Sequence, residues 1–336
     1  MTSRPPQHRA VLAAHAEVVP EHERPTPGPV AILPRPEPLF VEAIESAGGT
    51  VAELSPETRG IVWLDQSGAD EFARIFRDHP GVEWVQLPWA GVDAFSEVLA
   101  RDAASPRPRL IWTSAKGAYA QPVAEHALTL MLALLRDLPT RVSARSWGPK
   151  AGTSLYGLDV VIVGAGGIAL ELLRLLEPFG VRSTVVRRSS TPVAGAHRTV
   201  PSDLLHEVLP EADVVVLAAA LTTGGTSRML GTPEFEFMRD SAYVVNIARG
   251  GLIDTDALVE ALEAGRIAGA GLDVTDPEPL PDGHPLWNAP GVIITPHTAD
   301  TPEMTSLLLA ERLRHNVRAF LSEGDFEGRV DPAAGY

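Results

Sequence analysis

Cysteine is absent from all 336 residues, and its absence excludes disulfides, thiolate metal ligands and cysteine nucleophiles. Long apolar runs are also absent, because no run approaches the length of a membrane span. The longest run near the start, residues 10–14, is too short for the core of a signal peptide. We therefore expect a cytoplasmic protein with no membrane partner and no metal site.

Positive charge is scarce compared with negative charge, with 28 Lys and Arg residues against 43 Asp and Glu residues. The formal net charge of −15 is spread along the chain, which argues against a nucleic-acid partner. Residues 1–27 are rich in Pro, Arg, Glu and His, and we expect them to form a disordered tail.

The length predicts two domains, since a domain typically has about 100–200 residues. Short apolar strands first alternate with helices, which favours a small α/β unit with a parallel sheet. The expected strands are residues 30–33, 50–54, 60–64, 82–87 and 110–113, and the expected helices are residues 39–47 and 70–77. A helix over residues 123–135 is apolar almost all round, as expected of a helix buried between domains or subunits.

A larger series of strands and helices follows. Its expected strands are residues 160–163, 183–186, 214–217, 243–247, 268–272 and 292–295, with helices between them. Six strands alternating with helices favour a doubly wound parallel sheet. The last helix, residues 304–323, is expected to return to the first domain. The predicted domains are thus residues 28–122 with 302–330, and residues 123–301.

A glycine turn links the strand at residues 160–163 to the helix after it. Gly164 can make the sharp turn, Gly166 lets the backbone approach a pyrophosphate, and the helix start at Gly167 and Ile168 presents free N–H groups. The context of strand, turn and helix therefore predicts a dinucleotide site. Ala169 stands where the usual fingerprint has its third glycine, and this weakens the signal.

The end of the next strand indicates which dinucleotide is bound. In this fold an acid about 20 residues past the glycines binds the adenosine ribose and selects NAD. Here Arg187, Arg188 and Ser189 stand in that place. Because guanidinium groups match phosphate oxygens, we expect NADP to be preferred, with NAD possible. The simpler interpretation is that both arginines are ordinary exposed residues.

Three polar side chains follow later strands, at the edge where doubly wound sheets bind ligands. Arg249 would hold a substrate carboxylate and polarise a carbonyl, and His297 would give or take a proton. Glu278 would orient His297 and favour its charged form. Together they fit proton-coupled hydride transfer, although each alone could be an ordinary surface or loop residue. His126, in the apolar helix, is expected to serve packing or an inter-subunit hydrogen bond.

The motifs around these residues resemble those of the D-isomer-specific 2-hydroxyacid dehydrogenase family, which includes glyoxylate and hydroxypyruvate reductases. They are residues 122–127, the glycine turn, and residues 246–254, 273–279 and 295–299. The resemblance implies a Rossmann-type domain beside a smaller flavodoxin-like substrate domain. It also implies that Arg249, Glu278 and His297 are catalytic. Because the family is usually dimeric, it implies a homodimer as well.

The same resemblance implies further contacts. It places the substrate carboxylate on the backbone N–H groups of Ala90 and Gly91, with Arg249, and the nicotinamide carboxamide on Asp273. Cofactor contacts are expected also at Ala220 and Ala248, although residues 217–222 lack the proline often found there.

The sequence therefore predicts an NADP-preferring, homodimeric oxidoreductase that reduces small 2-oxo acids of the glyoxylate and hydroxypyruvate type to D-2-hydroxy acids. The alternative is a nucleotide-sensing, non-catalytic interaction protein on the same fold, as the corepressors of this family are.

Overall fold

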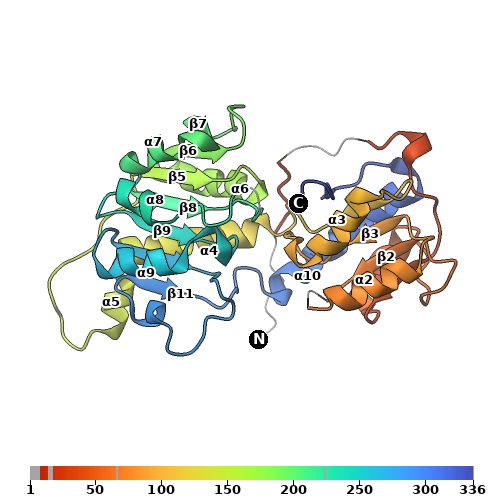
Figure 1. The fold of residues 1–336 in the computed structure, drawn as a ribbon, viewed down its shortest axis with the longest axis horizontal. Coiled ribbons are helices and arrows are strands. Elements are labelled where there is room, and N and C mark those ends of the chain that lie inside the picture. Colours follow the sequence, from red (N-terminus) through yellow and green to blue (C-terminus); the bar gives the residue numbers. More distant parts are fainter. Residues whose placement is uncertain (1–7, 14–17, 66, 223–224, 336) are drawn as a thin grey trace. The chain divides into compact units, whose positions relative to one another are not determined.

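The computed structural model describes residues 8–13, 18–65, 67–222 and 225–335 (Figure 1). The chain divides into two compact units. Residues 1–119 and 302–336 form one, which we call the terminal unit, and residues 120–301 form the other, the central unit. Among the described residues, no helix is long and apolar enough to cross a membrane.

The terminal unit contains a parallel sheet in the order β1-β2-β3-β4. Its strands are β1 (Val30–Leu33), β2 (Gly60–Trp63), β3 (Trp84–Gln86) and β4 (Ile111–Thr113). The strand expected over residues 50–54 is reduced to one bridge, between Val51 and Val30 on the free edge of β1. It ends early because the chain turns at Ser55, whose carbonyl accepts from Thr58. If the bridged segment at Val51 is counted as the second strand along the chain, the five strands lie side by side in the order 2-1-3-4-5, which is the flavodoxin-like order.

Helices of the terminal unit pack around an aromatic core. They are α1 (Pro38–Ser46), α2 (Ala69–Asp78), α3 (Ser96–Ala104) and α10 (Pro302–Arg318), the last followed by a π turn over Ala319–Glu323. Phe72 and Phe76, one turn apart on α2, stack on each other with ring centroids 5.7 Å apart. Helix α10 packs on α1, so the expected return of the last helix to the first domain is confirmed. Helix α3 was not predicted, since only Val98 and Leu99 of its nine residues are buried.

The start of the chain differs from the disordered tail expected over residues 1–27. Val19 is only 2% exposed, and its backbone N–H donates to the carbonyl of Gly324. Glu21–Glu23 form a short 3₁₀ helix, and the Arg24 side chain donates to the carbonyl of Val19. The prediction from composition is therefore wrong for the described part of this segment, because the buried Val19 and a few hydrogen bonds to backbone carbonyls hold it in place. Residues 1–7 and 14–17 lie outside the described residues.

The central unit contains a seven-stranded parallel sheet in the order β11-β10-β9-β8-β5-β6-β7, and Figure 1 shows these strands following one another from β7 to β11. The strands are β5 (Asp159–Val163), β6 (Arg182–Arg187), β7 (Arg198–Pro201), β8 (Val214–Leu217), β9 (Tyr243–Asn246), β10 (Gly269–Leu272) and β11 (Val292–Ile294). The order reverses between β5 and β8, so the expected doubly wound sheet is confirmed. Strand β7 was missed because, at the sheet edge, only Val200 of its four residues is buried.

The central unit also contains helices. They are α4 (Ala120–Leu135), α5 (Leu138–Ser143), α6 (Gly167–Leu176), α7 (Leu205–Val208), α8 (Thr232–Phe237) and α9 (Thr255–Glu263). The apolar helix α4 packs on α6, β9, β10 and β11. Its Leu130 and Leu134 lie so close to Gly271 that a Cβ there would come within 3.0 Å of Leu130. Much of the apolar surface of α4 is therefore covered inside the central unit itself.

Candidate active site

The predicted site residues of the central unit gather at the carboxyl ends of neighbouring strands. The segments after β5, β6, β8, β9 and β10 hold the predicted cofactor residues, and Arg249, Glu278 and His297 follow β9, β10 and β11. All seven strands are parallel, so these segments lie along one edge of the sheet. Such an edge, beside the reversal of strand order, is where doubly wound sheets bind ligands.

The glycine turn between β5 and α6 leaves room for a ligand. Gly164 has φ of +114°, and a Cβ there would lie 2.5 Å from the carbonyl oxygen of Ala218, so the turns after β5 and β8 touch. A Cβ at Gly166 would meet nothing within 4 Å. Helix α6 begins at Gly167 beside this open space, and its first N–H groups suit a pyrophosphate. Ala169 is fully buried, so the packing accommodates an alanine at the third position of the fingerprint.

Two arginines stand at the end of the strand next to this turn. Arg187 is the half-buried last residue of β6, and Arg188 and Ser189 are exposed just after it. Because β6 pairs with β5, they stand about one strand spacing, roughly 4.8 Å, along the edge from the glycine turn. Ala220, after β8, is exposed, and Ala248, after β9, is buried. With Asp273 directly after β10, the predicted cofactor residues thus occupy five adjacent strand ends, those of β10, β9, β8, β5 and β6.

Asn246 fixes the turn that carries Arg249. Its fully buried side-chain amide donates to the carbonyl of Arg249 at 2.9 Å, and its carbonyl oxygen accepts from the N–H of Ala248 at 3.1 Å. Arg249 is half-buried, and its Nη1 donates to the carbonyl of Ala248 at 2.7 Å. A side chain fixed in this way places a guanidinium group at the sheet edge.

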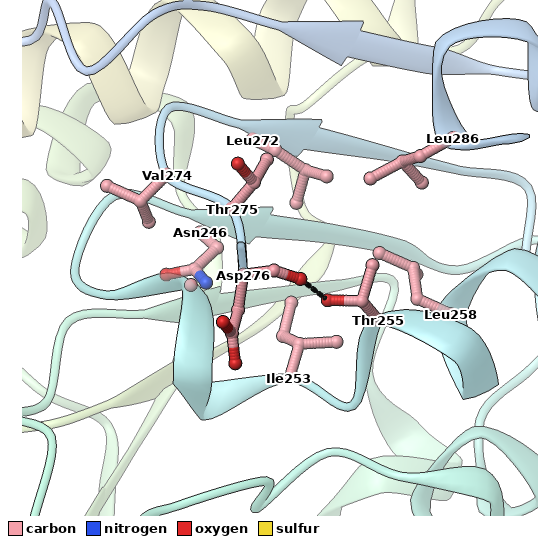
Figure 2. A pocket seen from close by; sticks show the side chains of 10 residues that line it. Asn246, Ile253, Thr255, Leu258, Leu272, Val274, Thr275, Asp276 and Leu286 are labelled. Atoms are coloured by element: carbon pink, nitrogen blue, oxygen red, sulfur yellow. Dashed lines mark hydrogen bonds between the residues drawn. The ribbon is translucent and has the colours of Figure 1, made fainter. Parts of the chain in front are cut away.

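A close backbone contact joins this turn to the segment after β10. A Cβ at Gly250 would lie 1.9 Å from the carbonyl oxygen of Thr275, so only glycine allows this approach. Figure 2 shows the small pocket beneath the two turns, where the Thr255 hydroxyl donates to the carbonyl of Asp276 at 2.6 Å. Arg249, Glu278 and His297 are not among the residues that line it. We therefore assign this pocket to the packing of the turns and not to a substrate.

Glu278 and His297 form an ion-pair geometry. Nδ1 of His297 lies 2.6 Å from Oε1 of Glu278, and the two side chains are 36% and 42% exposed. His297 has φ of +49°, in the left-handed region, and its backbone N–H donates to the carbonyl of Asp273 at 2.8 Å. Because Nδ1 is occupied by the carboxylate, Nε2 is the ring nitrogen left for a ligand.

Asp273 anchors the segment that carries His297. Its side chain is 1% exposed, and its carboxylate accepts from Thr295 Oγ1 at 2.6 Å and from the amides of Thr298 and Ala299 at 2.9 and 3.1 Å. Burial alone would raise the pKa of Asp273, but hydrogen bonds, the one with His126 first among them, outweigh it and lower that pKa. The ionised form is therefore the stable one. The nicotinamide carboxamide contact predicted for Asp273 would have to share a carboxylate already engaged by the protein.

Two titratable residues here were not assigned to the site from the sequence. His126 lies with Nε2 3.0 Å from Thr295 Oγ1 and 3.4 Å from Asp273 Oδ1, so it belongs to the Asp273 network. For Asp300, burial raises the pKa to about 6, although the charges of His297 and Arg249 oppose the shift. Its position directly after the motif at residues 295–299 was the one available signal, and burial is not visible in a sequence.

Ala90 and Gly91, predicted to receive the substrate carboxylate, belong to the terminal unit and follow β3. The preceding carbonyl, of Trp89, accepts from the N–H of Ala115 at 3.0 Å, and Ser114 Oγ donates weakly to the carbonyl of Ala90 at 3.5 Å. The segment is thus held by the chain that follows β4.

Known proteins share both the sequence pattern and the fold. Residues 128–299 match the family profile described as D-isomer specific 2-hydroxyacid dehydrogenase, NAD binding domain. An uncharacterised protein of Corynebacterium melassecola is 41% identical over 268 residues, which cover 78% of this chain and 86% of that protein. The human glyoxylate reductase/hydroxypyruvate reductase is 35% identical over 208 residues, 58% of this chain. That match spans 63% of the human protein, less than two thirds of its length.

Solved structures extend the likeness to nearly the whole chain. The crystal structure of a D-isomer specific 2-hydroxyacid dehydrogenase from Xanthobacter autotrophicus Py2, in complex with NADPH and MES, superposes with a TM-score of 0.78. It is 25% identical, and the match covers 93% of this chain and 100% of that one.

A pair of alanine substitutions tests the glycine turn. Gly164→Ala should lower the Tm by roughly 5 °C, because a positive φ and a backbone clash cost about 2 kcal/mol. Gly166→Ala should leave the Tm unchanged and weaken NADPH binding by about tenfold or more, since its Cβ would fill only the open space. Thermal unfolding and fluorescence titration with NADPH measure the two effects. If Gly166→Ala binds NADPH like the wild type, the pyrophosphate does not lie there.

Proposed function

Because this chain belongs to the D-isomer-specific 2-hydroxyacid dehydrogenase family, we propose that it reduces small 2-oxo acids of the glyoxylate and hydroxypyruvate type to D-2-hydroxy acids, with NADPH as the preferred cofactor. The observation that carries the proposal is the 2.6 Å contact between His297 Nδ1, after β11, and Glu278, after β10, beside the β9 strand end that bears Arg249. This arrangement offers a proton and a positive charge where the sheet binds ligands.

His297 acts as the general acid in this proposal. The hydride for the carbonyl carbon comes from bound NADPH. Protonated His297 gives a proton from Nε2 to the carbonyl oxygen, so that a hydride and a proton together convert the carbonyl group to an alcohol. Glu278, 2.6 Å from Nδ1, keeps the ring oriented and leaves Nε2 for the substrate. In the reverse direction, neutral His297 accepts the proton.

Arg249 binds the acid end of the substrate. Its guanidinium group pairs with the carboxylate and polarises the carbonyl, as charge-assisted hydrogen bonds do at an oxygen that gains charge. The clamp by Asn246 and the close fit of Gly250 support this role, because they fix the backbone on either side of Arg249. The backbone N–H groups of Ala90 and Gly91 are proposed to receive the same carboxylate.

The preference for NADP rests on the end of β6. Arg187 and Arg188 would pair with the 2′-phosphate, and no carboxylate stands there to accept the ribose hydroxyls of NAD. The related Xanthobacter protein was solved with NADPH, which is consistent with this choice.

Cofactor kinetics test the nucleotide assignment. The wild type should have a kcat/KM for NADPH at least about tenfold higher than for NADH, because two guanidinium groups meet the extra phosphate. Arg187→Asp should lower the NADPH value by about 10- to 100-fold and shift the preference towards NADH. Arg198→Asp makes the same charge change on the edge strand β7 and should leave the ratio unchanged. Equal wild-type constants for both cofactors would contradict the assignment.

His297→Ala tests the acid–base role. Turnover of a 2-oxo acid, followed by the loss of NADPH absorbance, should fall by about 10²- to 10⁴-fold while NADPH binding is retained. His206 offers a matched control, because its Nε2 also lies 2.6 Å from a carboxylate, that of Glu234, and His206→Ala should keep full turnover. Near-normal turnover in His297→Ala would disprove the role. A wild type that binds NADPH and reduces no 2-oxo acid would instead favour the non-catalytic nucleotide sensor.

The protein is also proposed to form a homodimer. Large exposed apolar side chains gather in residues 138–156 of the central unit: Leu138, Val142, Trp147 and Tyr156 are 44%, 79%, 97% and 67% exposed. The yellow-green chain after α5 runs out from the body of that unit in Figure 1. A protruding apolar segment of this kind is typical of a protein–protein interface.

Charge placed in this segment should separate the subunits. Val142→Glu combined with Trp147→Glu should halve the mass measured by light scattering at micromolar concentration, because two carboxylates would be buried without partners. Val18→Glu, at another exposed valine, should leave the mass unchanged. A wild type with the mass of a single chain would rule the dimer out.

A further inference from the structure

The indole N–H of Trp89 is a buried donor for which the described part of the chain supplies no acceptor. Buried N–H groups in folded proteins nearly always have a partner. The other indoles that are not fully exposed follow this rule: Trp63 donates to the carbonyl of Asp65, Trp84 to Thr113, Trp112 to Asp102 and Trp287 to the carbonyl of Pro281. Trp89 is therefore the exception that points to a ligand.

The ring of Trp89 is held in place. It meets the ring of Tyr119 edge-on, with centroids 6.2 Å apart and an interplanar angle of 78°. The Tyr119 hydroxyl donates to the carbonyl of Pro88 at 2.8 Å, and the N–H of Ala115 donates to the carbonyl of Trp89 at 3.0 Å. Both the backbone and the ring of Trp89 are thus in contact with residues of the terminal unit. The donor is in this sense preorganised.

The location of Trp89 suggests what the ligand is. It directly precedes Ala90 and Gly91, which the proposed function assigns to the substrate carboxylate. That carboxylate already has two backbone donors and the charge of Arg249 in the proposal, and the carbonyl oxygen has His297. A single uncharged donor suits a neutral oxygen elsewhere on the substrate. On a three-carbon 2-oxo acid, C3 is the remaining position that can bear one.

We propose that Trp89 determines specificity by donating a hydrogen bond to a hydroxyl on C3 of the substrate, which selects a 3-hydroxy-2-oxo acid. This inference rests on the proposed function and names its substrate class. Hydroxypyruvate supplies the acceptor, whereas pyruvate has a methyl group at C3, with no oxygen, and leaves the N–H unpaired. A site with a buried donor discriminates strongly against an analogue that lacks the acceptor.

The experiment compares hydroxypyruvate with pyruvate in the wild type and in Trp89→Phe, with NADPH. Phenylalanine keeps an aromatic ring at this position and removes the N–H donor together with part of the ring volume. The kcat/KM for hydroxypyruvate should fall by about 10- to 100-fold, and that for pyruvate should stay within about threefold. The ratio of kcat/KM for hydroxypyruvate to kcat/KM for pyruvate should therefore fall in the variant. A role limited to folding would not move this ratio.

Trp112→Phe is the matched control, since it makes the same change in the same unit at an indole already paired with Asp102. It should lower the Tm and leave the substrate ratio unchanged. Equal losses for both substrates in Trp89→Phe, or a wild type that prefers pyruvate, would overturn the role of Trp89 and leave the proposed reductase activity intact. A wild type that reduces neither acid nor glyoxylate would overturn the proposed function and this inference together.

Discussion

The buried carboxylate of Asp273 is the interaction on which the reactive edge depends. It follows β10, and it accepts from Thr295, Thr298 and Ala299 in the segment after β11, with His126 of α4 beside it. These donors and a nearly complete loss of solvent make the ionised side chain a strong link between two neighbouring strand ends. His297 lies inside the linked segment, and its own N–H bonds the backbone of Asp273. The left-handed backbone of His297 is therefore held from both sides, and its ring is aimed at Glu278.

Glycine supplies the second constraint, which is backbone contact between neighbouring turns. Gly164 touches the turn after β8, and Gly250 touches the segment after β10. Each contact leaves no space for a Cβ, so the strand-end turns pack as one layer rather than as separate loops. Gly166 is different, because nothing crowds it. A glycine without an internal packing reason, set among glycines that have one, is best explained by the approach of a ligand.

The sequence was most informative where the signal was local and periodic. Buried strands such as residues 160–163 and 214–217, the doubly wound order and the family membership were all predicted and are confirmed. Edge strand β7 and helix α3 were missed because each buries too few residues to produce a pattern. The attachment of Val19 was missed because composition describes a segment and not its contacts.

Site residues divide in the same way. Arg249, Glu278 and His297 stood out because each follows a strand end, whereas the burial of Asp300 and the missing partner of Trp89 are tertiary facts. No spacing in the sequence indicates that the buried indole N–H of Trp89 lacks an acceptor among the described residues.

The charge of the chain explains why its binding groups must act at short range. A net charge of −15 opposes the approach of any anion, and both proposed ligands, NADPH and a 2-oxo acid, are anionic. Attraction must then come from groups placed within contact distance, and the cations proposed to pair with the anionic groups are arginines: Arg187 and Arg188 for the phosphate and Arg249 for the carboxylate. Arginine suits this role because its planar guanidinium group binds carboxylate and phosphate oxygens through directed hydrogen bonds as well as through its charge. Selectivity among anions would accordingly lie in the fixed directions of a few donors, and Trp89, which carries no charge, would extend the same principle to the neutral part of the substrate.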